Sequence, residues 1–303
     1  MSLFDDLRLY DLKEDPENYE LAVKGLLEIK DNDLLVNSLL KGLYCDSDRS
    51  SAFTRYLASL EFKAILNLIS IFSIDTAAPL CEIGGGPGFL AWALKQSGFS
   101  DVSLLEPSNQ WLTGTGYLRT RRDSKNIKIV NDLESWYSDQ RKYKTIITRN
   151  VLHHFRGLTY TIACIQQKIE PSGYWIVVRE PTVESASELH DMLAHHPFCQ
   201  PNGVYEFAYP SSQLVRSFEL VGFTLDAVVP REYCNNALRK YIEEPGNRLN
   251  RIFTGVIDSI LYLLPNATEK MYRFESLVNS CFPINVKLFT RPQVLIFRKV
   301  SHY

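Results

Sequence analysis

The segment Glu82–Gly88, with the sequence Glu-Ile-Gly-Gly-Gly-Pro-Gly, joins a short apolar run to a pattern typical of a helix. Glycines allow a tight turn and let a ligand approach the backbone closely, because they carry no Cβ. Pro87 fits the first turn of the following helix, where a backbone N–H has no intrahelical partner. The same proline removes a donor from a loop that would have to bind a pyrophosphate. A ligand without phosphate therefore suits this loop better than a dinucleotide.

Groups that could move a proton follow two other apolar runs. His153 and His154 come directly after one run, and Glu180 ends another. A histidine has a pKa near neutrality and can take a proton from a hydroxyl group. Adjacent side chains on a turn diverge, so we expect at most one of the two histidines to face a ligand, while the other packs locally. Glu180 could orient a substrate, act as a base or pair with a cation such as Arg179.

The elements that must position these residues follow from short apolar runs that alternate with amphipathic stretches. Most of the runs are apolar throughout, which suits a parallel sheet covered on both faces. The alternation predicts a doubly wound α/β sheet. The runs are residues 79–83, 101–106, 126–130, 144–148, 174–180 and 223–229. The final stretch 284–300 reads as extended chain, with Pro292 at the start of its strand or in the turn before it.

Residues 1–75 read as a helical cap, and residues 76–303 as the α/β domain. Within the cap, Pro16 suits the first position of a helix, a second helix starts after Asp31-Asn32, and a third starts near Asp48 and runs through residues 51–73. Residues 231–284 read as a helical insertion ahead of the last strand.

The glycine loop closely resembles the first motif of class I S-adenosylmethionine-dependent methyltransferases, whose Rossmann-like sheet has seven strands, the last of them reversed. "VSLLEPS" is similar to the second strand of that family, "IKIVNDLES" to the third and "YKTIITRNVLHHF" to the fourth strand and the turn after it. "IEPSGYWIVVREP" resembles the fifth strand, with Pro171 and Gly173 in the turn before it. The likeness covers roughly residues 78–230 and the C-terminal tail.

The resemblance implies S-adenosylmethionine as the cofactor. Glu106 would bind both ribose hydroxyls, and Asp132 would accept from the adenine amino group beside the N–H of Leu133, although Asp132 could also simply cap the next helix. A cation or phenol on the last cap helix, where Arg49 lies, would hold the methionine carboxylate. The expected cofactor-binding residues are Glu82, Gly84, Gly85, Gly86, Gly88, Glu106, Pro107, Asp132, Leu133, Arg149, Asn150, Arg55 and Tyr56, and the expected catalytic residues are His153, His154 and Glu180.

Other classes of function find little support. The 33 Lys and Arg against 35 Asp and Glu, a net charge of -2, give no overall attraction to nucleic acid or anionic lipid. The early acids argue against a signal peptide, and six scattered cysteines suggest a reducing cytoplasm. Arg149 stands where magnesium-dependent relatives carry an acid, so we expect no catalytic metal. It could instead attract an anionic substrate or pair with an acid.

The sequence therefore predicts a cytoplasmic, metal-independent methyltransferase, a monomer or homodimer, that acts on a hydroxyl group of a small molecule or a glycan precursor. Methylation of nitrogen or of RNA is the main alternative. A protein that binds S-adenosylmethionine without catalysis is another. A nicotinamide-dependent reductase is disfavoured by Pro87.

Overall fold

The computed structural model describes residues 16–155, 157–183, 185–196, 207–230 and 292–301. Seven strands form one sheet in the order β3-β2-β1-β4-β5-β7-β6, in which β7 alone is antiparallel to its neighbours β5 and β6. The predicted Rossmann-like, seven-stranded sheet is confirmed. The strands are β1 Leu80–Ile83, β2 Val102–Leu105, β3 Ile127–Val130, β4 Tyr143–Arg149, β5 Ile169–Val178, β6 Phe223–Pro230 and β7 Pro292–Lys299.

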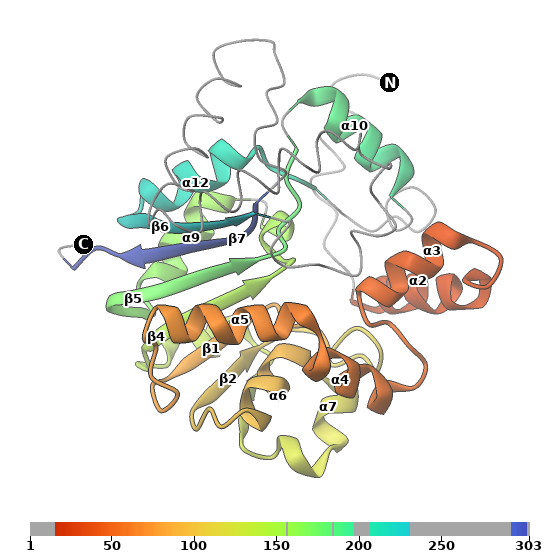
Figure 1. The fold of residues 1–303 in the computed structure, drawn as a ribbon, viewed down its shortest axis with the longest axis horizontal. Coiled ribbons are helices and arrows are strands. Elements are labelled where there is room, and N and C mark those ends of the chain that lie inside the picture. Colours follow the sequence, from red (N-terminus) through yellow and green to blue (C-terminus); the bar gives the residue numbers. More distant parts are fainter. Residues whose placement is uncertain (1–15, 156, 184, 197–206, 231–291, 302–303) are drawn as a thin grey trace.

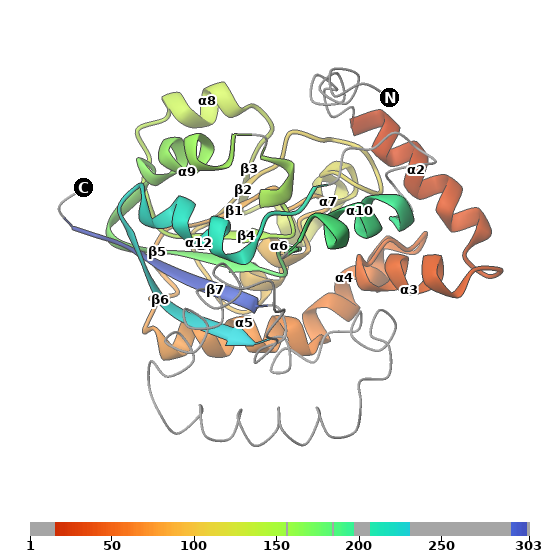
Figure 2. The ribbon, with the colours of Figure 1, turned by 90° about the horizontal axis from the view of Figure 1, so that it is seen from above.

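Helices cover both faces of the sheet (Figures 1 and 2). Side chains alternate along each strand. Ile147 of β4 packs with α4, α5 and α6, whereas its neighbour Ile146 packs with α8, α9 and α12 on the other face. The helices are α2 Pro16–Ile29, α3 Leu34–Gly42, α4 Arg49–Ala58, α5 Leu60–Ile71, α6 Phe89–Gln96, α7 Gly116–Thr120, α8 Leu133–Ser138, α9 Leu158–Gln166, α10 Ala186–His195 and α12 Ser211–Glu219, with short 3-10 turns η2 Arg122–Ser124 and η3 Leu152–His154.

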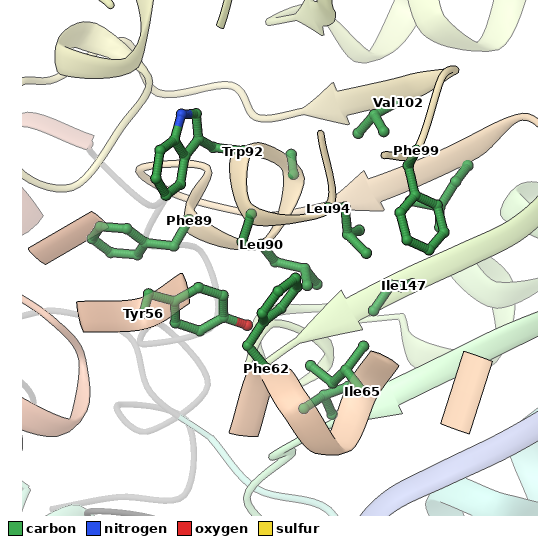
Figure 3. Close-up of a cluster of buried hydrophobic side chains, with 14 of the residues drawn as sticks. Tyr56, Phe62, Ile65, Phe89, Leu90, Trp92, Leu94, Phe99, Val102 and Ile147 are labelled. Carbon is green, nitrogen blue, oxygen red and sulfur yellow. The ribbon is translucent and has the colours of Figure 1, made fainter. Parts of the chain in front are cut away.

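The long helix predicted from about Asp48 is wrong in one respect, because it is broken at Ser59. Helix α4 ends at Ala58, and the extended Ser59 (φ −68°, ψ 153°) caps α5 by accepting a hydrogen bond from Phe62 N at 3.1 Å. Serine at such a position offers the backbone an alternative to a continuous helix. The break lets α4 and α5 pack on α6 and the strands together as one aromatic and aliphatic cluster, shown in Figure 3.

Three smaller expectations meet different outcomes. Pro16 begins α2, as predicted. Pro87 does not lie in the first turn of α6, because that helix begins at Phe89 and is preceded by Gly88 as its N-cap residue. Pro171 and Gly173 lie inside β5 rather than in a turn before it, because the strand already pairs with β4 at Ile169, ahead of a register shift.

The N-terminal helices α2 and α3 form a separate small cluster that includes Leu112 from the loop after β2. The division into a cap of residues 1–75 and an α/β domain of residues 76–303 stays a prediction. The predicted insertion at 231–284 lies outside the described residues. Within the part of the chain that is described, no helix combines the length and apolarity needed to cross a bilayer.

Candidate active site

The predicted site residues gather at the carboxyl ends of β1, β2, β4 and β5. The strand order reverses between β1 and β4, and ligands of open α/β sheets bind at such a reversal. Helices α2, α3, α4 and α10 stand at this end of the sheet in Figure 1. The site is thus built where parallel strands end, and the N-terminal helices cover it.

The glycine loop is packed closely by the protein itself. Gly84 has φ +65°, a conformation that side chains rarely adopt, and its N–H donates to Leu105 O at 2.8 Å. A Cβ at Gly84 would lie 2.1 Å from Val151 Cγ2, and a Cβ at Gly86 would lie 3.1 Å from Thr113 O. Glycine is therefore required here by two neighbouring loops as well as by any ligand.

Glu106 and Glu82 both support the glycine loop. The carboxylate of Glu106, at the end of β2, accepts hydrogen bonds from Gly86 N and Ser108 N, each at 2.8 Å. Glu82 is buried in β1, and its carboxyl group accepts from Ala91 N of α6 at 2.7 Å. Gly88 has no side chain to cap α6, so Glu82 takes over this part of the capping. Both acids thus fix the backbone that a ligand would touch.

The pKa of Glu82 is raised to about 8, chiefly by burial and in smaller part by the nearby Glu106 carboxylate, although the Ala91 N–H and Arg149 act in the opposite direction. A folded-state pKa above the ordinary value near 4.5 means that the folded protein holds a proton which the unfolded chain releases as the pH rises from about 4.5 to 8. Wild-type protein should therefore lose stability relative to Glu82→Gln across this window, by up to roughly 1.4 kcal/mol per pH unit. Urea unfolding of both proteins at pH 5, 7 and 9 measures the difference, and parallel profiles would contradict it.

The residues expected around adenine lie at the ends of β2 and β3. Asp132 is exposed and caps α8, accepting from Glu134 N at 3.2 Å and Ser135 N at 2.8 Å. These bonds, above all the one with the Ser135 hydroxyl, lower the pKa of Asp132. Leu133 and Pro107 are exposed beside it. The capping role is thus present, and Asp132 Oδ1, which accepts only from Glu134 N among these bonds, retains a further lone pair for a ligand.

The cations expected near the methionine end divide into two groups. Arg149 is largely buried at the end of β4, donates to Glu61 of α5 at 2.6 Å and lies over the ring of Tyr56 at 5.1 Å. Arg55 instead points outward and pairs with Asp46 in a half-exposed position. The structure therefore brings Arg149 and Tyr56 together and leaves Arg55 outside their cluster.

Arg49 and Asn150 flank this cluster. Arg49 is buried over the ring of Phe89 at 5.0 Å and donates to Tyr44 O at 2.9 Å. Burial lowers the pKa of Arg49. Asn150 follows β4 with φ +55°, a conformation that asparagine tolerates better than most residues. Its N–H donates to Val178 O at 2.9 Å, which holds the start of the turn against β5.

The two histidines occupy different environments. Glu180 is buried and its carboxylate accepts from Val151 N and Leu152 N at 3.0 Å and from His153 N at 2.6 Å. His153 Nδ1 lies 2.7 Å from the same carboxylate, and the ring is almost fully buried. His154 is only half-buried, with its ring centroid 4.0 Å from that of His153. Glu180 thus fixes the turn and one imidazole, and the second imidazole stands beside it.

Two buried acids of the N-terminal helices were not predicted from the sequence. Glu61 binds Arg149 and Arg179, and Glu20 of α2 accepts from Leu112 N and Thr113 N in the loop after Glu106, at 3.0 and 2.9 Å. Glu20 lies three residues before the buried Val23, on the apolar side of its helix. An acid at an apolar position of an amphipathic helix is the signal that could have found it.

No three His, Cys, Asp or Glu side chains of the described ranges gather closely enough to hold a metal ion. The charged groups at the site are instead the guanidinium groups of Arg149 and Arg179 and four carboxyl groups, each of which bonds to the backbone or to another side chain, and an imidazole pair lies beside them. This donor set suits a polar, zwitterionic organic ligand.

Comparison with known proteins places the chain in a family. The family model described as "Methyltransferase domain" matches residues 53–228, more than half of the chain. None of the curated proteins matches it. Among solved structures, a provisionally named sarcosine dimethylglycine methyltransferase from Galdieria sulphuraria is 12% identical with a TM-score of 0.49, over 80% of this chain and 85% of that one. Magnesium protoporphyrin IX methyltransferase from Synechocystis PCC 6803, with bound SAH, is 15% identical with a TM-score of 0.44, over 61% and 82%.

The mitomycin 7-O-methyltransferase MmcR is 17% identical with a TM-score of 0.42, over 68% of this chain and 56% of that one. The region that matches the family model contains helix α5, the glycine loop, Glu106, the turn after β4 and Glu180. It therefore includes the elements that build the site described above, apart from helices α2 and α3 and the first turn of α4 with Arg49. The chain belongs to the methyltransferase family and is an S-adenosylmethionine-dependent methyltransferase.

Proposed function

We propose that the protein transfers a methyl group from S-adenosylmethionine to a hydroxyl group of a small molecule or a glycan precursor, without a catalytic metal. The observation that carries this proposal is the histidine pair on a turn that Glu180 fixes at the end of β4, next to the glycine loop. A hydroxyl acceptor needs a base, and an imidazole beside the methyl donor meets that need.

The site fits the cofactor in the places that the structure describes. The glycine loop would receive the amino-acid end of the cofactor, because a backbone without Cβ atoms lets a ligand approach closely. The Glu106 carboxylate at the end of β2 would accept from the ribose hydroxyls, and Asp132 with Leu133 would border adenine. The cofactor, when bound, supplies an electrophilic methyl group on a thioether leaving group.

The chain's own residues then have three tasks. The Glu180 carboxylate favours a proton on Nδ1 of His153, so that Nε2 is its basic nitrogen, and it keeps the turn rigid. His154, which is less buried, would take the proton from the acceptor hydroxyl. Helices α2–α4 would exclude water from the carboxyl ends of the strands. A general base contributes on the order of 10²–10⁴-fold to the rate of such a reaction. Alignment of the two reactants contributes a larger share.

A transfer assay with tritiated S-adenosylmethionine tests the proposal. Three acceptor pools are tested separately. The first contains alcohols and phenols, the second contains amines, and the third is total RNA. Label on the hydroxyl pool is the expected result. Label found only on amines or on RNA would show that the acceptor is a nitrogen atom or RNA rather than a hydroxyl group. Cofactor binding with no label in any pool would favour a protein that binds without transferring.

Glu106→Ala should weaken binding of S-adenosylhomocysteine by about 1–3 kcal/mol, the usual effect of losing a charged hydrogen-bond partner. The substitution removes the two hydrogen bonds expected with the ribose hydroxyls, and it also removes the acceptor of the Gly86 N–H. Isothermal titration calorimetry measures the change. Asp226→Asn is the control, because Asp226 pairs with Arg298 on the far strands β6 and β7. Equal affinity of wild type and Glu106→Ala would remove Glu106 from the ribose role.

A further inference from the structure

A buried carboxylate on the cap holds two arginines at the strand ends. Glu61 of α5 accepts from Arg149 Nε at 2.6 Å through one oxygen and from Arg179 Nη1 at 3.1 Å through the other. Burial alone would raise the pKa of Glu61, but the two guanidinium groups bring it below its ordinary value. Glu61 is thus ionised at neutral pH, and the three side chains together carry one net positive charge in a buried place.

Backbone geometry aims both arginines at this point. Arg149 is two residues after Ile147, so its side chain points to the same face of the sheet, toward α4–α6. The pairing of Ile83 with Thr148 places Arg149 beside Gly84, where the glycine loop leaves β1. Arg179, by alternation, would point to the opposite face, but its φ of +55° breaks the alternation and its guanidinium reaches Glu61.

The cluster has donors left over. Arg149 Nη2 and the Tyr56 hydroxyl are buried, and neither finds a hydrogen-bond partner among the residues that the structure describes. Figure 3 shows the Tyr56 ring between Phe89 and Phe62, with its hydroxyl group directed inward. Buried donors without partners are unfavourable. Two such donors, beside a net positive charge and the glycine loop, are what an incoming anion needs.

We propose that Glu61 is a positioning residue, which engages Arg149 through Nε so that Arg149 Nη2 and the Tyr56 hydroxyl are left to bind the carboxylate at the amino-acid end of the cofactor. The inference rests on the proposed use of this loop by S-adenosylmethionine. The occupant is an anion rather than a second neutral group, because Arg149 Nη2 can only donate, the Tyr56 hydroxyl can donate as well, and the cluster is cationic. The cofactor carries one carboxylate, and that carboxylate lies at the end of the molecule which the glycine loop would receive.

Two ligands separate this role from a structural one. S-adenosylhomocysteine has the carboxylate, whereas its decarboxylated analogue, S-adenosyl-3-thiopropylamine, keeps the adenosine, the thioether and the amino group without it. We expect calorimetry to show that the wild type prefers S-adenosylhomocysteine by at least about tenfold. Glu61→Gln should reduce this preference to about twofold or less, mainly by weakening the ligand that carries the carboxylate. Glu61→Asp should restore part of the preference.

A second variant keeps the test valid if Glu61→Gln folds poorly. Tyr56→Phe removes only a hydroxyl group that has no partner in the described residues, so the variant should be as stable as the wild type or more stable. It should still lower the preference for the carboxylate several-fold. Asp226→Asn, at the distant pair with Arg298, should keep the wild-type ratio.

The outcomes are distinct. Equal losses for both ligands in Glu61→Gln and Tyr56→Phe would show a structural role only and overturn the inference. A wild-type protein that binds both ligands equally would also overturn it, while leaving the proposed cofactor intact. A wild-type protein that binds neither ligand would instead overturn the proposed use of this site.

Discussion

Replacing Glu180 with alanine is expected to lower the free energy of unfolding by about 3–5 kcal/mol and to abolish methyl transfer. The carboxylate accepts from three successive backbone N–H groups, at Val151, Leu152 and His153, and also contacts the His153 ring. Alanine would leave these donors buried without an acceptor, a change of the size seen when one partner of a buried charged network is removed. Urea unfolding and the tritium transfer assay measure the two effects.

The control for this prediction is Asp226→Asn, which removes a partly exposed carboxylate from its pair with the exposed Arg298. Its effect on stability should stay within about 0.5 kcal/mol. Glu180→Gln keeps one acceptor oxygen but turns an amide group toward N–H donors, so its stability should fall between those of the wild type and Glu180→Ala. A Glu180→Ala protein that unfolds like the wild type would show that solvent replaces the carboxylate without loss.

Gly84→Ala is expected to destabilise the protein by about 2–5 kcal/mol and to remove measurable binding of S-adenosylhomocysteine. The new Cβ would lie 2.1 Å from Val151 Cγ2, and φ of +65° is strained for alanine. Val151 cannot turn away easily, because its side chain is β-branched and Glu180 holds its N–H. The loop must therefore move away from the turn after β4, and the site between them is lost.

Gly98→Ala separates strain from overlap. Gly98 has φ +94°, but no atom lies within 4 Å of the position of its Cβ. It should therefore show only the conformational cost, about 1–2 kcal/mol, with unchanged ligand affinity. Val151→Ala removes the Cγ atoms from the overlap, so the double variant Gly84→Ala/Val151→Ala should recover part of the stability lost in Gly84→Ala. Strictly additive effects would contradict the proposed overlap.

The sheet could be predicted because its signals are local. Each apolar run lies within a few residues of the strand observed, and Pro292 begins β7, which is one of the two places expected for it. The prediction of one continuous helix across Ser59 was wrong because an amphipathic pattern continues on both sides of the break. The break itself depends on one side chain, Ser59, which caps the start of α5. The expected turn at Pro171 failed because proline is tolerated in a strand next to an irregularity.

Only part of the site could be predicted from the sequence. Arg49, Ala52, Phe53 and Tyr56 follow the spacing of one buried helical face, and Arg55 lies outside it. Periodicity could thus have separated Tyr56 from Arg55. The bonds of Glu61, in contrast, join residues 88 and 118 positions apart. Such pairs are created only when the cap packs on the strand ends, so no short pattern announces them.

The reversed direction of β7 has a practical consequence. Because β7 is antiparallel to β5, Arg298 lies opposite Tyr174, near the amino-terminal margin of the parallel strands, and the exposed Ser301 follows just beyond it. A dye or a surface tether attached at Ser301 would therefore sit on the opposite rim from the glycine loop. Immobilised protein would keep the carboxyl ends of the strands, where the glycine loop lies, turned to the solution. This orientation makes surface-based titration of dilute candidate acceptors feasible.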